Sequence, residues 1–304
     1  MNAFDVDLPP SFTESITDPY VMFYADCYLP EQLDNELRRT FPDRLMLNRL
    51  GERLAVNIDL SENSVEIREF LSANPVWNRY LQSWKSPSAL RKLIERFSNQ
   101  WDLRWYRSWR FFFKQRSRKP NNLEVTVLLS VYRAGFQLAP HSDDKFKLLS
   151  LIHYLPYDAD TNDPGAGTTF FVPKSHCKRR DLRQFSEWSR GLRRYLPLWL
   201  APTIEASLSR RYLVSDEVNL DERSRFSKFF EVNRHVGYRT NRISGFLKND
   251  WSMHEVNLRE FPDNALRRAV LINVRLRPKM ASHIIPKIES FAMKIKKVRR
   301  RHAD

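Results

Sequence analysis

The sequence has few cysteines, few glycines and no long apolar run, and each shortage excludes a class of protein. Two cysteines, Cys27 and Cys177, cannot form a disulfide framework across 304 residues, so we expect a reducing compartment. No apolar run approaches the roughly 18 residues that cross a bilayer, and the first ten residues lack the apolar core of a signal peptide. Seven glycines and eight tryptophans indicate a packed, enzyme-like domain rather than a linker-rich chain, and the cysteine usage makes the cytoplasm the expected location.

Negative charge is also in short supply. The chain carries 51 Lys and Arg against 36 Asp and Glu, a formal net charge of +15. This balance favours an anionic partner, such as nucleic acid, a phosphate-bearing glycan or an acidic membrane face, and it is equally consistent with solubility alone. No RRM, zinc-finger or P-loop pattern supports the nucleic-acid option.

The N-terminal third is predicted to be mostly helical. Leu33, Leu37 and Phe41 recur at i, i+4 and i+8, which predicts one amphipathic helix over residues 30–41 that Pro42 ends. The other elements expected here are an irregular arm (1–20), short strands (43–60) and helices between 64 and 99 that break near Pro75 and Pro87.

From Leu123 the apolar period becomes that of strands. The predicted strands are 123–132, 147–155, 165–173, 241–246 and 267–275. Close spacing and glycine-bearing turns favour an antiparallel sandwich or barrel. We expect a single domain over 1–304. Its parts are support elements (20–122), a sheet core (123–276) with a basic, largely helical insertion (174–240, helical over 179–200) that covers one mouth, and a basic amphipathic C-terminal helix (277–304).

Residues 141–143 read His-Ser-Asp, a pattern that can bind a metal. A strand puts residues i and i+2 on one face, so the His141 imidazole and the Asp143 carboxylate can point into one cavity. They are two thirds of the two-histidine, one-carboxylate set that holds non-haem Fe(II) and leaves positions open. His254 is the best candidate for the third ligand, because it follows a predicted strand and turn well after the first pair.

The strand expected after His254 has an unusual polar face. Arg267 shares this face with Asn273 and Arg275, whereas Arg268 begins the apolar face that should pack against the helices. The polar face suits a wet cavity, where an arginine can form a bidentate pair with a carboxylate. Strand parity favours Arg267 for this role, with Arg268 as the alternative.

These motifs, in this order, resemble the Fe(II)/2-oxoglutarate-dependent dioxygenases, and most closely their prolyl-hydroxylase-like branch. The resemblance is carried by the motifs His141-Ser-Asp143, Trp251-Ser-Met-His254 and Arg267-Arg-Ala-Val270, with Leu151–Leu155 and Gly165–Phe170 as intervening strands. It covers roughly residues 123–276 and, more loosely, the helices from about residue 20.

The resemblance implies an α+β fold with a double-stranded β-helix (jelly-roll) core backed by the N-terminal helices. One Fe(II) would be held by His141, Asp143 and His254. Arg267 would bind the far carboxylate of 2-oxoglutarate, Tyr154 would donate its hydroxyl to the same group, and Tyr132 would line the cavity nearby. The class uses O2 to oxidise 2-oxoglutarate to succinate and CO2, and it hydroxylates or otherwise oxidises a C–H bond.

Other interpretations stay open. A nucleic-acid demethylase of the same superfamily is favoured by the charge and by the Tyr132–Gly135–His141 spacing. Against it, Ser130 stands where that branch carries Asn, and Asn273 where it carries a second Arg. A jelly-roll binding module without redox activity is the alternative from another class. We expect a small-molecule or glycan substrate, which can be anionic. We expect the protein in the cytoplasm, with peripheral contact to an anionic membrane through the C-terminal helix as a further option.

Overall fold

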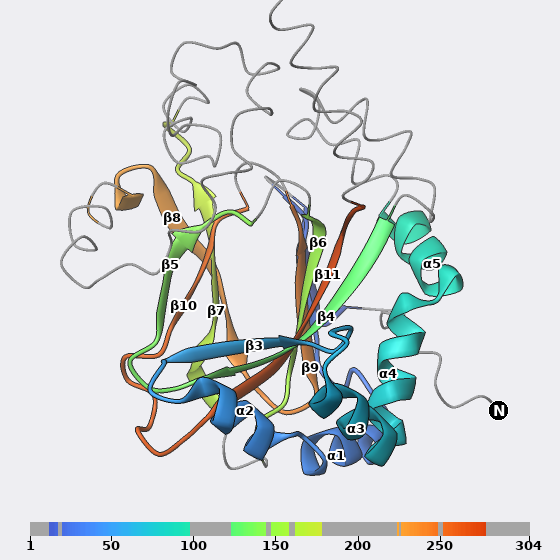
Figure 1. Cartoon of the computed structure of the whole chain (residues 1–304). Coiled ribbons are helices and arrows are strands. Elements are labelled where there is room, and N and C mark those ends of the chain that lie inside the picture. Colours follow the sequence, from blue (N-terminus) through green and yellow to red (C-terminus); the bar gives the residue numbers. More distant parts are fainter. Residues whose placement is uncertain are drawn as a thin grey trace, which may run out of the picture.

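The structure is a computed structural model that describes several stretches of the chain, drawn with their helices and strands in Figure 1. The described residues are 12–17, 20–97, 123–143, 147–157, 162–177, 224, 226–248 and 252–277. Three features of the sequence analysis lie outside the described residues: the expected helical piece 179–200, the residue Trp251, and the expected C-terminal helix after Arg277. No helix within these stretches is both long and apolar enough to span a membrane.

Two antiparallel sheets face each other and form the core (Figure 1). The large sheet has the strand order β1-β2-β9-β6-β11-β4-β3, and the small sheet has the order β5-β10-β7-β8. Strands β4, β6, β9 and β11 lie in the large sheet and β5, β7, β8 and β10 in the small one, which is the arrangement expected for a jelly roll. The strands are β1 (Glu14–Ile16), β2 (Met22–Ala25), β3 (Ala55–Asp59), β4 (Leu123–Tyr132), β5 (Gln137–His141), β6 (Lys147–Tyr154), β7 (Asp163–Pro173), β8 (Phe230–Tyr238), β9 (Arg242–Leu247), β10 (His254–Asn257) and β11 (Arg267–Leu276).

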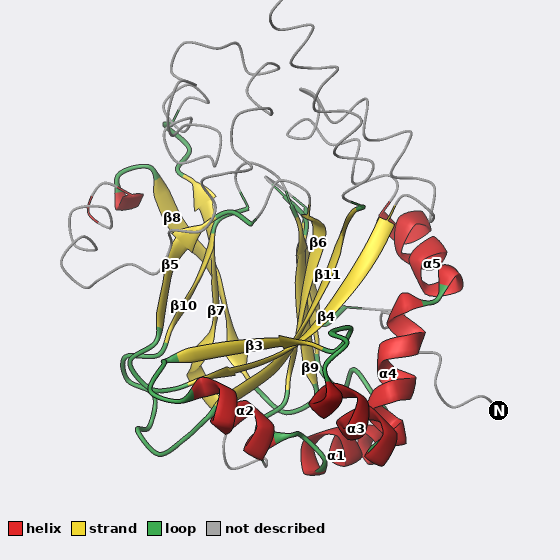
Figure 2. Cartoon of the chain, viewed as in Figure 1, coloured by secondary structure: helices red, strands yellow, loops and turns green. Residues whose placement is uncertain are grey.

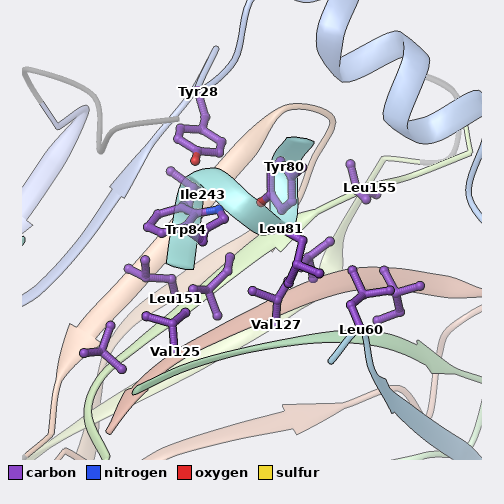
Figure 3. Close-up of a cluster of buried hydrophobic side chains, with 14 of the residues drawn as sticks. Tyr28, Leu60, Tyr80, Leu81, Trp84, Val125, Val127, Leu151, Leu155 and Ile243 are labelled. Atoms are coloured by element: carbon purple, nitrogen blue, oxygen red, sulfur yellow. The ribbon is translucent and has the colours of Figure 1, made fainter. Parts of the chain in front are cut away.

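Five helices in the described N-terminal region cover the outer face of the large sheet (Figure 2). They are α1 (Glu31–Arg39), α2 (Asp43–Leu50), α3 (Val65–Ala73), α4 (Pro75–Lys85) and α5 (Pro87–Phe97). Prolines at the first positions of α4 and α5 set the two breaks that the sequence predicts. Trp84 and Leu81 of α4 pack on Val125, Val127 and Leu151 of the sheet (Figure 3). This apolar layer supports the sheet that carries half of the candidate site.

The alternation along β11 decides which side chains enter the space between the sheets. Val270, Ile272 and Val274 belong to the core cluster shared with the helices. Residues opposite each other in an antiparallel pair share a face, so the other face of β11, from Arg267 to Asn273, points toward the small sheet. The predicted division of this strand into an apolar outer face and a polar inner face is confirmed.

Three sequence-based predictions are wrong. The short strands expected over 43–60 are confirmed only at β3, and residues 43–50 form helix α2 instead. Met46 and Leu50 bury one face of this helix at i, i+4, while Asp43 lies in its first turn. Glu14–Ile16 forms β1 within the segment expected to be an irregular arm. Phe230–Tyr238 is a core strand, β8, so the segment 174–240 is not an insertion throughout. An edge strand with one exposed, polar face carries little apolar signal.

The helix layer is joined to β6 by a buried polar cluster around His153. Its Nε2 lies 3.5 Å from the Asp34 carboxylate of α1, and its Nδ1 lies 3.1 Å from the Tyr80 hydroxyl of α4. The second Asp34 oxygen accepts a 2.9 Å hydrogen bond from Arg38 Nε. His153 therefore faces the outer packing, as its alternation with Tyr154 predicts.

Replacing Asp34 with alanine is expected to lower the free energy of unfolding by about 3 kcal/mol, since it removes the buried carboxylate that accepts from Arg38 Nε and lies beside His153 Nε2. Chemical denaturation measures the change. Glu31→Ala, an exposed acidic residue of the same helix, is the control and is expected to stay within about 0.5 kcal/mol of the parent. Equal losses in both variants would contradict a stabilising role for the buried cluster.

Candidate metal centre

Two histidines from neighbouring strands of the small sheet and one aspartate beyond a strand end meet at a single point. His141 closes β5 and lies directly opposite His254, the first residue of β10, with ring centroids 4.3 Å apart. Asp143 follows two residues after β5, and one ligand atom from each of the three residues lies within 4.8 Å of the others. In the part of the chain that the structure describes, this is the only such group of three or more His, Cys, Asp or Glu side chains.

Both imidazoles are oriented by backbone carbonyls. His141 Nδ1 lies 2.9 Å from the Ala139 carbonyl oxygen, and His254 Nδ1 lies 3.2 Å from that of Ser252. A carbonyl can only accept, so each Nδ1 carries the hydrogen and each Nε2 keeps its lone pair for a metal. Burial lowers the pKa of both rings, and with the neighbouring His141 it lowers the pKa of His254 to about 3. Both rings are therefore neutral near pH 7, the form that binds a metal.

Asp143 is held in its charged form. Burial alone would raise the pKa of Asp143, but the Lys147 ammonium and the Ser150 hydroxyl hold it well below its usual range. Lys147 Nζ donates to Oδ1 at 2.9 Å, and Ser150 Oγ donates to Oδ2 at 2.5 Å. The donor set is thus two neutral nitrogens and one carboxylate.

Arg267 lies inside the sandwich with one donor group unsatisfied. It is 1% exposed, its Nε donates to the Ala166 carbonyl at 2.6 Å, and its Nη2 has no hydrogen-bond partner among the described residues. A buried guanidinium nitrogen without an acceptor is costly, so this geometry suits an anionic group supplied from outside the chain.

Its neighbour Arg268 points the other way. The Arg268 guanidinium donates to Asp43 Oδ2 at 2.5 Å and lies over the Phe41 ring at 5.2 Å, both in the helix layer. Of the two arginines, only Arg267 reaches the space between the sheets, as strand parity predicts.

Three tyrosine rings surround the Arg267 guanidinium. The distances from its Cζ to the ring centroids are 5.2 Å for Tyr132, 5.2 Å for Tyr154 and 5.7 Å for Tyr238. The Tyr154 hydroxyl donates to Thr168 Oγ1 at 2.8 Å. Both tyrosines singled out from the sequence therefore lie against the predicted arginine.

The third tyrosine, Tyr238, escaped the sequence analysis because it ends β8, in the segment taken for an insertion. Burial raises its pKa to about 12, so it keeps its proton, and its oxygen accepts the backbone N–H of Arg268 at 3.0 Å. The only sequence signal for it is the short run Val236-Gly-Tyr238, in which two buried residues flank a glycine.

The arginine and the triad both border the cluster of side chains between the two sheets, which includes Tyr154 beside Arg267 and Phe246 beside His254. Arg267 and Asn273 share the inner face of β11, and Asn273 lies 3.3 Å from Ser150, which binds Asp143. The Phe246 ring of β9 lies 4.5 Å from the His254 ring. The remaining described histidines lie elsewhere: His153 is in the helix layer, His176 is exposed, and His235 is an exposed residue of β8.

Gly167 sets the position of the carbonyl that binds Arg267. A Cβ at Gly167 would collide with the Val236 carbonyl of β8, so only glycine lets β7 and β8 approach this closely. Ala166, whose carbonyl accepts from Arg267, is the preceding residue.

Gly167→Ala is expected to lower the free energy of unfolding by about 3 kcal/mol, because two backbones must separate to admit the methyl group. Thermal unfolding measures the loss. Gly165→Ala is the matched control, since its added Cβ would meet no backbone atom of a non-adjacent residue within 4 Å and only the Asp163 Oδ1 at 3.2 Å. A loss at position 165 as large as at 167 would contradict the close approach of β7 and β8 as the cause.

Comparisons with known proteins give structural likeness and no sequence match. No protein-family model matches the chain, and no curated protein matches it. The similar solved structures include a prolyl-4-hydroxylase from Pseudomonas putida (12% identity, TM-score 0.35, covering 85% of this chain and 94% of that one). They also include the non-heme alpha ketoglutarate dependent carbocyclase SnoK from nogalamycin biosynthesis (12%, 0.41, 88% and 87%). A third is EvdO2 from Micromonospora carbonacea var. aurantiaca, complexed with 2-oxoglutarate (13%, 0.38, 84% and 86%).

These neighbours are Fe(II)/2-oxoglutarate-dependent oxygenases, the class that the sequence resembles. At such identities and TM-scores the likeness says nothing about the activity of this chain. Its function has to be inferred from the arrangement of its own side chains.

Proposed function

We propose that the protein is an Fe(II)- and 2-oxoglutarate-dependent oxygenase that hydroxylates an unactivated C–H bond. The observation that carries the proposal is the presence of two features between the same two sheets: the His141–Asp143–His254 donor set and the unsatisfied Arg267 guanidinium. Two neutral imidazoles and one carboxylate match the three-ligand set that holds Fe(II) with open positions. A buried donor nearby matches the need of a dianionic cosubstrate for a cationic partner.

Each residue has a defined part in this proposal. His141, Asp143 and His254 would hold the metal, and Arg267 would bind the far carboxylate of 2-oxoglutarate with Tyr154 and Tyr132 against it. When bound, Fe(II), 2-oxoglutarate and O2 supply the oxidation, with succinate and CO2 as the expected co-products. The protein itself contributes orientation and the exclusion of water.

The surroundings of Ser130 and Asn273 support a hydroxylase over the demethylase alternative. Ser130 Oγ donates to Asn57 Oδ1 at 2.6 Å, and Asn273 is engaged with Ser150 beside the carboxylate ligand. Position 130 offers a serine where the demethylase branch carries an asparagine, and position 273 offers an asparagine where that branch carries its second arginine. A binding module without redox activity would need no buried donor set of this kind. Such a module is expected to bind no iron and to release no succinate from 2-oxoglutarate.

The substrate and surroundings are proposed more broadly. The net charge of +15 supports a small molecule or glycan that carries an anionic group. We place the protein in the cytoplasm, with peripheral contact between the basic C-terminal segment and an anionic membrane as an additional proposal.

The test is to add Fe(II) to the purified chain, measure the stoichiometry, and follow succinate release from 2-oxoglutarate under air without a substrate. One bound iron per chain and slow succinate formation are expected. A screen of anionic metabolites and glycans for faster succinate release then identifies the substrate class. A chain that binds no iron and forms no succinate would be a binding module, and methylated single-stranded DNA that stimulates turnover would restore the demethylase.

A further inference from the structure

The Asp143 carboxylate is attached to the large sheet through two buried side chains that no metal-binding pattern predicts. Ser150 of β6 and Asn273 of β11 lie directly opposite each other in the sheet, and both are 4% exposed. Ser150 Oγ lies 2.5 Å from Asp143 Oδ2 and 3.3 Å from Asn273 Oδ1. The three residues thus form a chain of contacts from β11 through β6 to the carboxylate.

Because a hydroxyl has a single hydrogen, it is possible to say which group donates and which accepts in each of these contacts. Ser150 has one hydrogen, and the closer, charged acceptor is the Asp143 carboxylate. The Ser150 oxygen can then accept a hydrogen bond in turn, and the Asn273 amide supplies one once its NH2 group faces the serine. The two ends of an amide are interchangeable in shape, so this orientation needs no movement of the backbone.

This series of hydrogen bonds selects one oxygen of Asp143 for the metal. The Ser150 hydroxyl engages Oδ2, and the oxygen nearer His141 is Oδ1, which lies 3.9 Å from His141 Nε2. Oδ1 also accepts from Lys147 Nζ at 2.9 Å, and a carboxylate oxygen with one such donor keeps a further acceptor position for a metal. The two histidines are fixed by the ladder of β5 and β10, whereas Asp143 lies beyond the end of β5 and depends on side-chain partners.

We propose that Ser150 is a positioning residue that turns Asp143 toward the metal through Oδ1, and that Asn273 acts through Ser150. The proposal rests on the metal site of the proposed function and assigns Asn273 a part in holding the carboxylate. Partners of metal ligands typically change metal affinity by about 10- to 100-fold when they are removed.

The experiment titrates the full-length chain with Mn(II) alone by calorimetry, with thermal unfolding of each variant as the check on folding. Ser150→Ala is expected to weaken Mn(II) binding by about 10- to 100-fold, and Asn273→Ala by less. Because Asn273 acts through Ser150, the double variant is expected to bind Mn(II) as Ser150→Ala does. Ser150→Thr, which keeps the hydroxyl, is expected to restore most of the affinity. Ser130→Ala is the matched control, because Ser130 is a fully buried serine on the inner face of β4 whose hydroxyl binds Asn57.

The outcomes separate this proposal from the function beneath it. A parent chain that binds no Mn(II) overturns both. A parent that binds Mn(II) and a Ser150→Ala variant of equal affinity overturn the positioning role alone, as does a control that loses affinity equally. Additive losses in the double variant would show that Asn273 acts independently, and a lower melting temperature with unchanged affinity would reduce Ser150 to a structural role.

Discussion

Replacing His254 with alanine is expected to abolish both stoichiometric iron binding and the release of succinate from 2-oxoglutarate. The variant removes one of three ligands and leaves His141 and Asp143, which can occupy only two coordination positions of the metal. Changes to the partners of a ligand already cost about 10- to 100-fold in metal affinity, so loss of a ligand itself is expected to cost more than about 100-fold. Iron titration and a succinate assay measure the two losses.

His235→Ala provides the matched control for this histidine. His235 is exposed on β8, where it contacts Thr169 Oγ1 at 2.8 Å and the Pro164 carbonyl oxygen at 2.5 Å, and it lies outside the metal-binding group. Iron binding and turnover are expected to stay within about twofold of the parent, as for other surface substitutions. Normal iron stoichiometry in His254→Ala would exclude His254 as a ligand and with it the proposed function.

Arg267→Met is expected to raise the KM for 2-oxoglutarate by about 100-fold while metal affinity changes little. Truncating one partner of a buried charge pair costs about 2–5 kcal/mol in binding, and each 1.4 kcal/mol is a factor of ten. Methionine keeps most of the apolar volume among the tyrosine rings, so the loss reports on charge and hydrogen bonding. Initial rates of succinate formation against 2-oxoglutarate concentration give the KM.

The adjacent arginine supplies the control for this prediction. Arg268→Met removes the ion pair with Asp43 in the helix layer, so it is expected to lower thermal stability and to leave the KM for 2-oxoglutarate within about twofold. The reverse pattern, with a raised KM in Arg268→Met and a normal KM in Arg267→Met, would identify Arg268 and not Arg267 as the residue that binds 2-oxoglutarate.

The sequence predicts the parts of the fold and site that depend on local periodicity. Strand β4 runs from Leu123 to Tyr132 as expected, because alternating burial leaves a period of two. The same rule puts Arg267 between the two sheets and Arg268 against the helix layer. His141 and Asp143 could be paired from their spacing, and His254 from its place after a predicted turn.

The parts that the sequence did not predict depend on contacts between distant segments. Tyr238 reaches Arg267 because β8 pairs with β7, and nothing in its own segment announces that partner. Ser150 and Asn273 look like ordinary polar residues within strands until β6 and β11 lie side by side. Helix α2 was missed because a short helix carries too few apolar positions to display its period.

The division of the centre between the two sheets has a mechanical consequence for the whole sandwich. Both imidazoles belong to the small sheet, while the side chains that donate to the carboxylate, Ser150 and Lys147, come from β6 of the large one. An ion seated among these groups would act as a cross-link between the layers and oppose their separation. Cation uptake and the cohesion of the two sheets would then be thermodynamically linked, each strengthening the other.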